Sequence, residues 1–193
     1  MKLNIYENYY YIFKYGQGLI CVARGSGKLI GTLPVTGSSQ FTFSHGYCYF
    51  VMDGSDGVQH LYNVPADDIS APAEAWIDMG NNYCSELCAD GDYIFGLYKN
   101  NSTGKQQVFR MDIYSGDFDN FWFDQTEWPE DFYQMNVYDN YVYYTAGDEK
   151  VYRFYADPTV ETFSIETVYT ADAGHYIEYI SLNQLSNLNM VIT

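Results

Sequence analysis

Two short segments decide the fold of this chain: Asn140-Tyr141-Val142-Tyr143 and Val151-Tyr152-Arg153-Phe154. Both consist mainly of β-branched and aromatic residues, which favour strands because their side chains pack well on a pleated surface. The residues between them are few enough to form a turn. The pair of segments therefore predicts a β-hairpin.

The same pair of segments occurs four times along the chain. A marker tyrosine lies in the first segment of each pair, at positions 9, 47, 93 and 141, so successive units are 38, 46 and 48 residues apart. Turn-forming residues join the two segments, as in Asp53-Gly54-Ser55-Asp56-Gly57, which lacks the ligand spacing of a calcium-binding loop. The remaining second segments are Leu19-Ile20-Cys21-Val22, Leu61-Tyr62-Asn63-Val64 and Val108-Phe109-Arg110-Met111.

Each unit contains two further segments that favour strands. The segments that follow the hairpin are Lys28–Leu33, Glu74–Asp78, Phe118–Phe123 and Glu161–Val168. The segments that precede a marker tyrosine, or begin a new unit, are Lys2–Tyr6, Phe41–Phe43, Tyr83–Cys88, Phe132–Val137 and Tyr176–Leu182. Four short strands in roughly 45 residues are typical of a β-propeller blade.

We therefore predict an all-β fold, a β-propeller-like array of four-stranded antiparallel blades, with four blades and a partial fifth. The pattern places the blades at about residues 2–33, 39–78, 83–123 and 132–168, and the partial blade at 176–193, within a single domain. Helical periodicity is absent throughout.

The last stretch, Ser186–Thr193, resembles the start of another unit, so only half a blade is expected there. Three arrangements are open. The last strands complete a four-bladed ring by overlap, form a two-stranded fifth blade, or leave an edge that another chain covers. A strand simply packed on the last blade is a further alternative.

The pattern also resembles a known group of repeats. Three features in succession resemble bacterial β-propeller repeats of the quinoprotein-like and LDL-receptor-like kind. They are the marker tyrosine, the strand Val108-Phe109-Arg110-Met111 and the turn Asp112-Ile113-Tyr114-Ser115-Gly116. Trp122 lies ten residues beyond Asp112, whereas the tryptophan of quinoprotein repeats lies eight residues beyond the aspartate. No quinone cofactor is indicated. The resemblance implies a platform for binding, which carries catalysis in only some members.

Composition excludes several classes of protein. Of the 193 residues 47% are hydrophobic, which excludes a disordered polymer. Nine Lys and Arg against 25 Asp and Glu give a net charge of −16. Nucleic acids and anionic membranes attract basic faces, so we expect neither as a partner.

The cysteines and the N-terminus indicate the compartment. The four cysteines, at positions 21, 48, 84 and 88, are too few and too scattered for a disulfide scaffold, so we expect free, buried thiols. The sequence Met1–Asn8 lacks the apolar run of a secretory signal, and no segment approaches the roughly 18–20 apolar residues of a membrane span. We expect a cytoplasmic or particle-associated protein.

Catalytic signatures are absent from the sequence. Gly27-Lys28 and Gly104-Lys105 lack the other residues of a phosphate-binding loop, and no Gly-x-Ser-x-Gly motif occurs. His45, His60 and His175 share no metal-ligand spacing with the cysteines, so structural or surface roles are expected. We predict no metal and no cofactor.

Polar and aromatic residues gather in loops that the blade pattern places on one face. One loop contains Asp124, Glu127 and Asp131 together with Trp128. The same face is expected to hold Asn81, Asn82, Asn100 and Asn101. Such side chains suit a sugar or a basic protein partner, and two facing carboxylates would suit glycoside hydrolysis. The alternative is a solvated acidic rim that keeps the protein soluble.

We predict that the protein is a non-enzymatic interaction or assembly module. It would bind a protein partner through its loop face and its open strand edge, or associate with copies of itself by strand-edge pairing. A carbohydrate-binding propeller is the first alternative. A glycoside hydrolase or lyase that uses paired carboxylates at the central well is the second.

Overall fold

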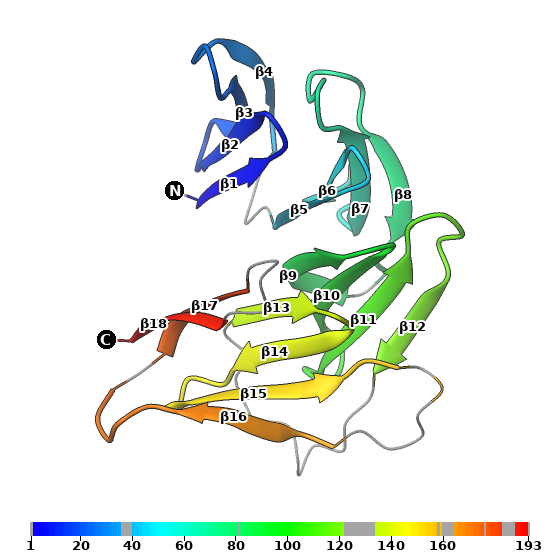
Figure 1. Cartoon of the computed structure of the whole chain (residues 1–193). Helices are drawn as coiled ribbons and strands as arrows, with labels where there is room; N and C mark the ends of the chain where they lie inside the picture. The colour runs from blue at the N-terminus through cyan, green and yellow to red at the C-terminus, as the bar shows by residue number, and fades with distance from the viewer. Residues whose placement is uncertain are drawn as a thin grey trace. The chain divides into compact units, whose positions relative to one another are not determined.

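The computed structural model describes residues 2–35, 40–80, 82–121, 134–157, 159, 164–175, 177–182 and 188–192. These residues form eighteen strands, β1 to β18, and no helix (Figure 1). They fall into two compact units. The first contains residues 1–85 with Asn100–Thr103, and the second contains Glu86–Lys99 with Gly104–Thr193.

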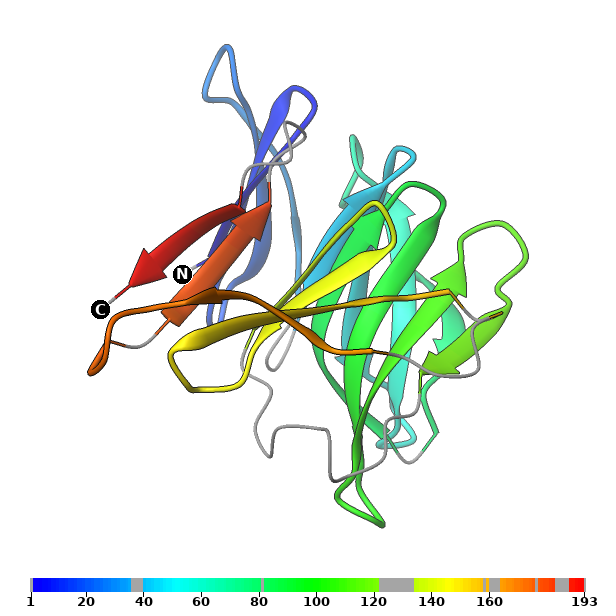
Figure 2. The ribbon, with the colours of Figure 1, turned by 60° about the horizontal axis from the view of Figure 1, so that its bottom comes forward.

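Four sheets have four antiparallel strands each, and in every one the strands pair in chain order (Figure 2). In the first unit the strands are β1 (Lys2–Tyr6), β2 (Tyr9–Lys14), β3 (Gly18–Ala23), β4 (Leu29–Leu33), β5 (Phe41–Ser44), β6 (Tyr47–Asp53), β7 (Gln59–Pro65) and β8 (Glu74–Asp78). The next two sheets are β9 (Asn82–Asp90), β10 (Tyr93–Asn100), β11 (Gln106–Asp112), β12 (Phe118–Phe121), β13 (Gln134–Tyr138), β14 (Tyr141–Thr145), β15 (Lys150–Tyr155) and β16 (Glu166–Thr170).

A fifth sheet contains only β17 (Ile177–Leu182) and β18 (Leu188–Ile192). The predicted β-propeller-like array of four blades and a partial fifth is therefore confirmed. Of the arrangements that the sequence left open, the last strands form a two-stranded sheet. That residues 1–193 constitute one domain stays a prediction.

The core of the first unit lies between sheets β1–β4 and β5–β8. Tyr11, Leu19 and Cys21 of the first sheet pack against Phe41 and Phe50 of the second in one buried cluster. The Tyr11 hydroxyl donates a hydrogen bond of 2.6 Å to the carbonyl oxygen of Ala66, 55 residues away. This bond satisfies both groups inside the core, where an unpaired polar atom would be destabilising.

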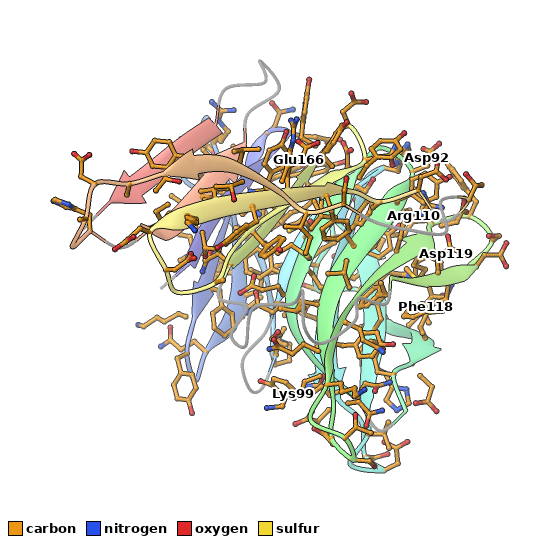
Figure 3. The ribbon with its side chains drawn as sticks, turned by 90° about the horizontal axis from the view of Figure 1, so that it is seen from below. Asp92, Lys99, Arg110, Phe118, Asp119 and Glu166 are labelled. Atoms are coloured by element: carbon orange, nitrogen blue, oxygen red, sulfur yellow. The ribbon has the colours of Figure 1, made fainter. Side chains whose placement is uncertain are left out.

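The marker tyrosines lie at the margin of the core rather than in it. The Arg110 guanidinium lies 4.4 Å from the ring centroid of Tyr93 and pairs with Asp119 at 2.8 Å (Figure 3). Arg153 repeats the arrangement over Tyr141, at 4.7 Å. Arg153 also pairs with Glu166 of β16 at 2.8 Å, so in both sheets the arginine contacts the second and fourth strands. The cation–π contact and the ion pair together hold the guanidinium in place.

The thiols are free, as expected, although their burial differs. Cys21, Cys48 and Cys84 are buried, and burial raises the pKa of the Cys48 thiol. Cys88 is only half-buried, which corrects the expectation for that residue. Its sulfur donates to the carbonyl oxygen of Met135 at 3.1 Å. In the described part of the chain, no helix is long and apolar enough to cross a membrane.

The second unit contains a position where only glycine fits. Gly96 on β10 lies opposite Phe109 on β11, and a Cβ at residue 96 would overlap the Phe109 ring. That ring is fully buried and stacks on Phe118 with centroids 4.7 Å apart, so it has no room to move away.

We expect Gly96→Ala to lower the free energy of unfolding by about 1–3 kcal/mol, because inserting a methyl group into a filled core forces side chains apart. Urea denaturation measures the change. Gly25→Ala is the matched control, because a Cβ there meets nothing within 4 Å and should alter stability by less than about 0.5 kcal/mol. Equal stability of the two variants would contradict this account of β10.

Alkaline pH is expected to destabilise the protein. Burial, together with a hydrogen bond to Asp148, raises the pKa of Tyr152 to about 12. Burial also raises the pKa of Tyr11 and Tyr144. The unfolded chain loses these protons near pH 10, before the folded chain does, so stability is complete below about pH 10 and falls as the pH rises further.

Urea denaturation at several pH values between about 8 and 11 checks this expectation. Tyr152→Phe should weaken the dependence on pH, whereas Tyr15→Phe should leave it unchanged because Tyr15 is 85% exposed. A slope that is the same in both variants would argue against a contribution from Tyr152.

Candidate functional site

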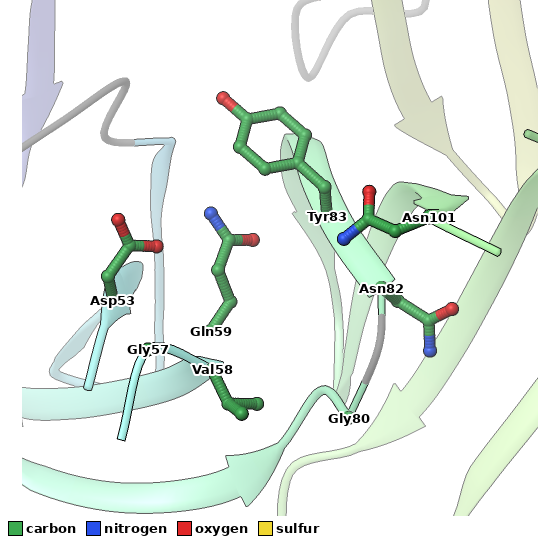
Figure 4. A pocket seen from close by; sticks show the side chains of 8 residues that line it. All are labelled: Asp53, Gly57, Val58, Gln59, Gly80, Asn82, Tyr83 and Asn101. Atoms are coloured by element: carbon green, nitrogen blue, oxygen red, sulfur yellow. The ribbon is translucent and has the colours of Figure 1, made fainter. Parts of the chain in front are cut away.

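The candidate site is a polar cavity of about 250 Å³ in the first unit. It lies where three connections meet: the β6–β7 turn, the segment between β8 and β9, and the tip of the β10–β11 hairpin. The residues that line it are Asp53, Gly57, Val58, Gln59, Gly80, Asn82, Tyr83 and Asn101. Figure 4 shows Asp53 and Gln59 on one side of the cavity and Tyr83 and Asn101 on the other.

The β6–β7 turn forms the first wall. Gly54 donates to the carbonyl oxygen of Val58 at 2.7 Å, and Gly57 has a φ of +78°, which favours glycine. The Asp56 carboxylate accepts from the Val58 amide at 3.0 Å and lies 3.2 Å from His60. The hydrogen bond from Val58, more than the contact with His60, lowers the pKa of Asp56. The hairpin turn predicted for this segment is confirmed.

The second wall is the segment that enters β9. The Gly80 amide donates to Asp78 at 2.7 Å, and the Asn82 side-chain amide donates to the Met79 carbonyl at 2.8 Å. The Asn82 side-chain oxygen is buried and has no hydrogen-bond partner among the described residues.

Gln59 joins the two walls. It begins β7, and its side-chain oxygen accepts a hydrogen bond of 2.8 Å from the Cys84 amide of β9. One side chain thus connects β7 to the start of β9 at the cavity.

The tip of the β10–β11 hairpin closes the third side. The Asn100 side-chain oxygen accepts from the amides of Ser102 and Thr103, both at 3.0 Å, which fixes the turn. Asn101, the next residue, is exposed and lines the cavity. Asn100 therefore fixes the turn that carries Asn101.

The lining is polar and nearly uncharged. Asp53 carries the one carboxylate among the eight lining residues, and Lys, Arg and His are absent from this set. Gln59, Asn82 and Asn101 offer amides that both donate and accept, and Tyr83 exposes 39% of its surface. Hydrolysis of a glycosidic bond normally needs two carboxylates, and this lining supplies one.

The structure brings together part of the predicted site. Asn82 and Asn101 line the cavity, and Asn100 holds the adjoining turn. The remaining predicted residues, Asn81, Asp124, Glu127, Trp128 and Asp131, lie outside the described residues.

Sequence reasoning missed Asp53, Gln59 and Tyr83. Asp53 and Gln59 flank the predicted hairpin turn, and Tyr83 directly follows Asn82. The signal that would have found them is their position at strand ends that share one end of adjacent blades.

The described histidines make local contacts, as the sequence suggested. His45 contacts Ser44 at 2.7 Å, His60 contacts Asp56, and His175 contacts the Asp172 carbonyl at 3.3 Å. Among the described residues no three His, Cys, Asp or Glu side chains form a group that could hold a metal ion.

Comparison with solved structures identifies the fold. A protein assigned as TolB from Agrobacterium tumefaciens has a TM-score of 0.63 at 12% identity, over 95% of this chain and 76% of its own. TolB from Acinetobacter baumannii has a TM-score of 0.51 at 13% identity, over 91% and 46%. Acylaminoacyl peptidase from Pyrococcus horikoshii has a TM-score of 0.59 at 12% identity, over 86% and 26%.

The TolB structures are β-propellers, so these likenesses agree with the fold. The chain spans only 26% of the length of the peptidase. No family model matches the sequence, and no curated protein matches it. At this level of identity the likeness concerns the fold alone, because one fold supports many functions.

The link through Gln59 leads to a prediction. Gln59→Ala should lower the free energy of unfolding by about 1 kcal/mol, because the Cys84 amide loses its side-chain acceptor. Hydrogen exchange at the Cys84 amide should accelerate. Gln59→Glu is the control, because a carboxylate still accepts from that amide. Unchanged exchange in Gln59→Ala would show that the side chain does not link the walls.

Proposed function

We propose that this protein is a non-enzymatic interaction module. It binds a segment of a partner protein at the loops around the polar cavity. The observation that carries the proposal is the polar cavity formed by three connections, with Tyr83, Asn101 and Asp53 accessible around it. Loops presented by a rigid scaffold are the usual place for binding residues.

The size and chemistry of the cavity favour side chains of a partner over an enclosed small molecule. Pockets for small molecules typically measure about 300–1,000 Å³ and are largely apolar. This cavity measures about 250 Å³ and is lined mainly by amides, glycines and one carboxylate. Amide side chains match the donors and acceptors of a peptide backbone, and Tyr83 offers an aromatic surface.

Charge favours a basic partner. The chain carries a net charge of −16, and Asp53 is the charged residue of the lining. Complementary potentials accelerate association and suppress partners of like charge. We therefore expect the bound segment to present Lys or Arg to Asp53.

A carbohydrate ligand is the second candidate. The exposed ring of Tyr83 beside Gln59 and Asn101 supports it, because sugar rings stack on aromatic side chains while amides bind hydroxyl groups. Catalysis is not part of the proposal, and the peptidase likeness does not extend to activity at 12% identity.

Other parts of the proposal depend on the sequence pattern. Three points remain predictions. They are the pairing of a partner strand with β18, the cytoplasmic or particle-associated setting, and the finer resemblance to quinoprotein-like and LDL-receptor-like repeats. A free strand edge is a common docking site for an extended segment.

A peptide array with and without Lys and Arg tests the main proposal. The native chain should bind a subset of basic peptides, and Tyr83→Ala or Asn101→Ala should weaken that binding by about tenfold or more. Tyr15→Ala is the matched control, because Tyr15 is an exposed tyrosine in the β2–β3 turn outside the cavity lining.

Absence of peptide binding by the native chain, or binding that neither cavity variant weakens, would refute the proposal. A glycan array probed with the same variants decides the second candidate. Glycan binding that depends on Tyr83, without peptide binding, would replace a protein partner by a sugar.

A further inference from the structure

The aspartates in the walls of the cavity differ in what they bind. The Asp56 carboxylate accepts a hydrogen bond from the Val58 amide, and the Asp78 carboxylate accepts one from the Gly80 amide. The Asp53 carboxylate lines the cavity and forms no hydrogen bond or ion pair within the part of the chain that the structure describes. Asp53 is therefore the acid in these walls that is available to a ligand.

The strand register places Asp53 beside an ordered neighbour. Asp53 ends β6 and pairs with Gln59, which begins β7, so the two side chains lie on the same face of the sheet. The hydrogen bond from the Cys84 amide holds the Gln59 side chain in place. Figure 4 shows the Tyr83 ring extending from the start of β9 toward the side of the cavity that carries Asp53 and Gln59. A carboxylate and an aromatic ring thus border the same small cavity.

Two arginines of the second unit show what this pair of groups binds elsewhere in the chain. The Arg110 guanidinium lies 4.4 Å from the ring centroid of Tyr93 and 2.8 Å from the Asp119 carboxylate. The Arg153 guanidinium lies 4.7 Å from the ring centroid of Tyr141 and 2.8 Å from the Glu166 carboxylate. In both places a tyrosine ring and a carboxylate from different strands hold one guanidinium group.

A guanidinium group also fits the cavity better than an ammonium group does. It is planar, so one face stacks on an aromatic ring while the N–H groups at its edge pair with a carboxylate. The side-chain oxygen of Asn101 offers an acceptor for a further N–H group. An ammonium group is compact and strongly hydrated, and it has no flat face to stack on Tyr83.

We propose that the cavity binds the guanidinium group of an arginine side chain, which pairs with the Asp53 carboxylate and stacks on the Tyr83 ring. This inference rests on the proposed function, because it names the residue that the bound segment of the partner inserts. It narrows the expected basic residue from Lys or Arg to Arg alone.

Isothermal titration calorimetry with variants of one peptide tests the proposal. The probe is the peptide that the native chain binds most tightly on the array, and we expect it to contain arginine. It is also synthesised with each Arg replaced singly by Lys or by citrulline, which keeps the planar shape of arginine without its charge. At one position both replacements should weaken binding by about tenfold or more, because hydrogen bonds to a charged group are lost.

Substitutions in the chain assign this preference to the cavity. Asp53→Asn should make the arginine and citrulline peptides bind equally, because the carboxylate that recognises the charge is gone. Tyr83→Phe should keep the preference for Arg over Lys and Tyr83→Leu should lose it, because only a ring stacks on the guanidinium. Asp67→Asn is the matched control, because Asp67 is exposed and lies outside the lining. Thermal unfolding verifies that each variant folds.

Three results would overturn the inference: a tightest peptide without arginine, equal binding of the Arg and Lys versions, or a preference for arginine over citrulline that Asp53→Asn leaves unchanged. In each case peptide binding that depends on Tyr83 and Asn101 would still support the proposed function. Absence of peptide binding by the native chain would instead refute the proposed function and this inference together.

Discussion

Face-to-face packing of sheets is the constraint on which the rest of the structure depends. The second and third strands of each four-stranded sheet carry apolar side chains on both faces. Such a sheet is stable only when neighbouring sheets cover these faces. Tyr11 and Cys21 belong to one face of the first sheet, while Ile12 and Ile20 belong to the other. The face that carries Tyr11 and Cys21 is covered by the second sheet and forms the core of the first unit.

The cavity is formed by turns and strand ends of the first unit. Gln59 spans the opening to reach the Cys84 amide, and Asn100 rigidifies the next hairpin. The amide lining of the cavity decides which ligands it suits.

Much of the fold could be predicted because the repeat is encoded locally. Alternation within Tyr141–Thr145 and Lys150–Tyr155, and the turns between such strands, depend on neighbouring residues alone. The site was harder to predict. Asn82 and Asn101 were expected to share a face, whereas the contributions of Gln59 and Tyr83 depend on register and on the direction of single side chains. The partly exposed marker tyrosines, covered by Arg110 and Arg153, also follow from contacts between strands.

The sequence by itself determined the four strands of each repeat, the absence of helices from the described residues and the net charge of −16. These properties follow from residue type and spacing. Only the tertiary structure decided that Asp53, Gln59 and Asn101 border one cavity, and that Phe41 and Met135 are buried against the preceding sheet. The physical reason is that burial depends on what lies opposite a side chain, and the strand pattern is the same whether or not a neighbouring sheet is present.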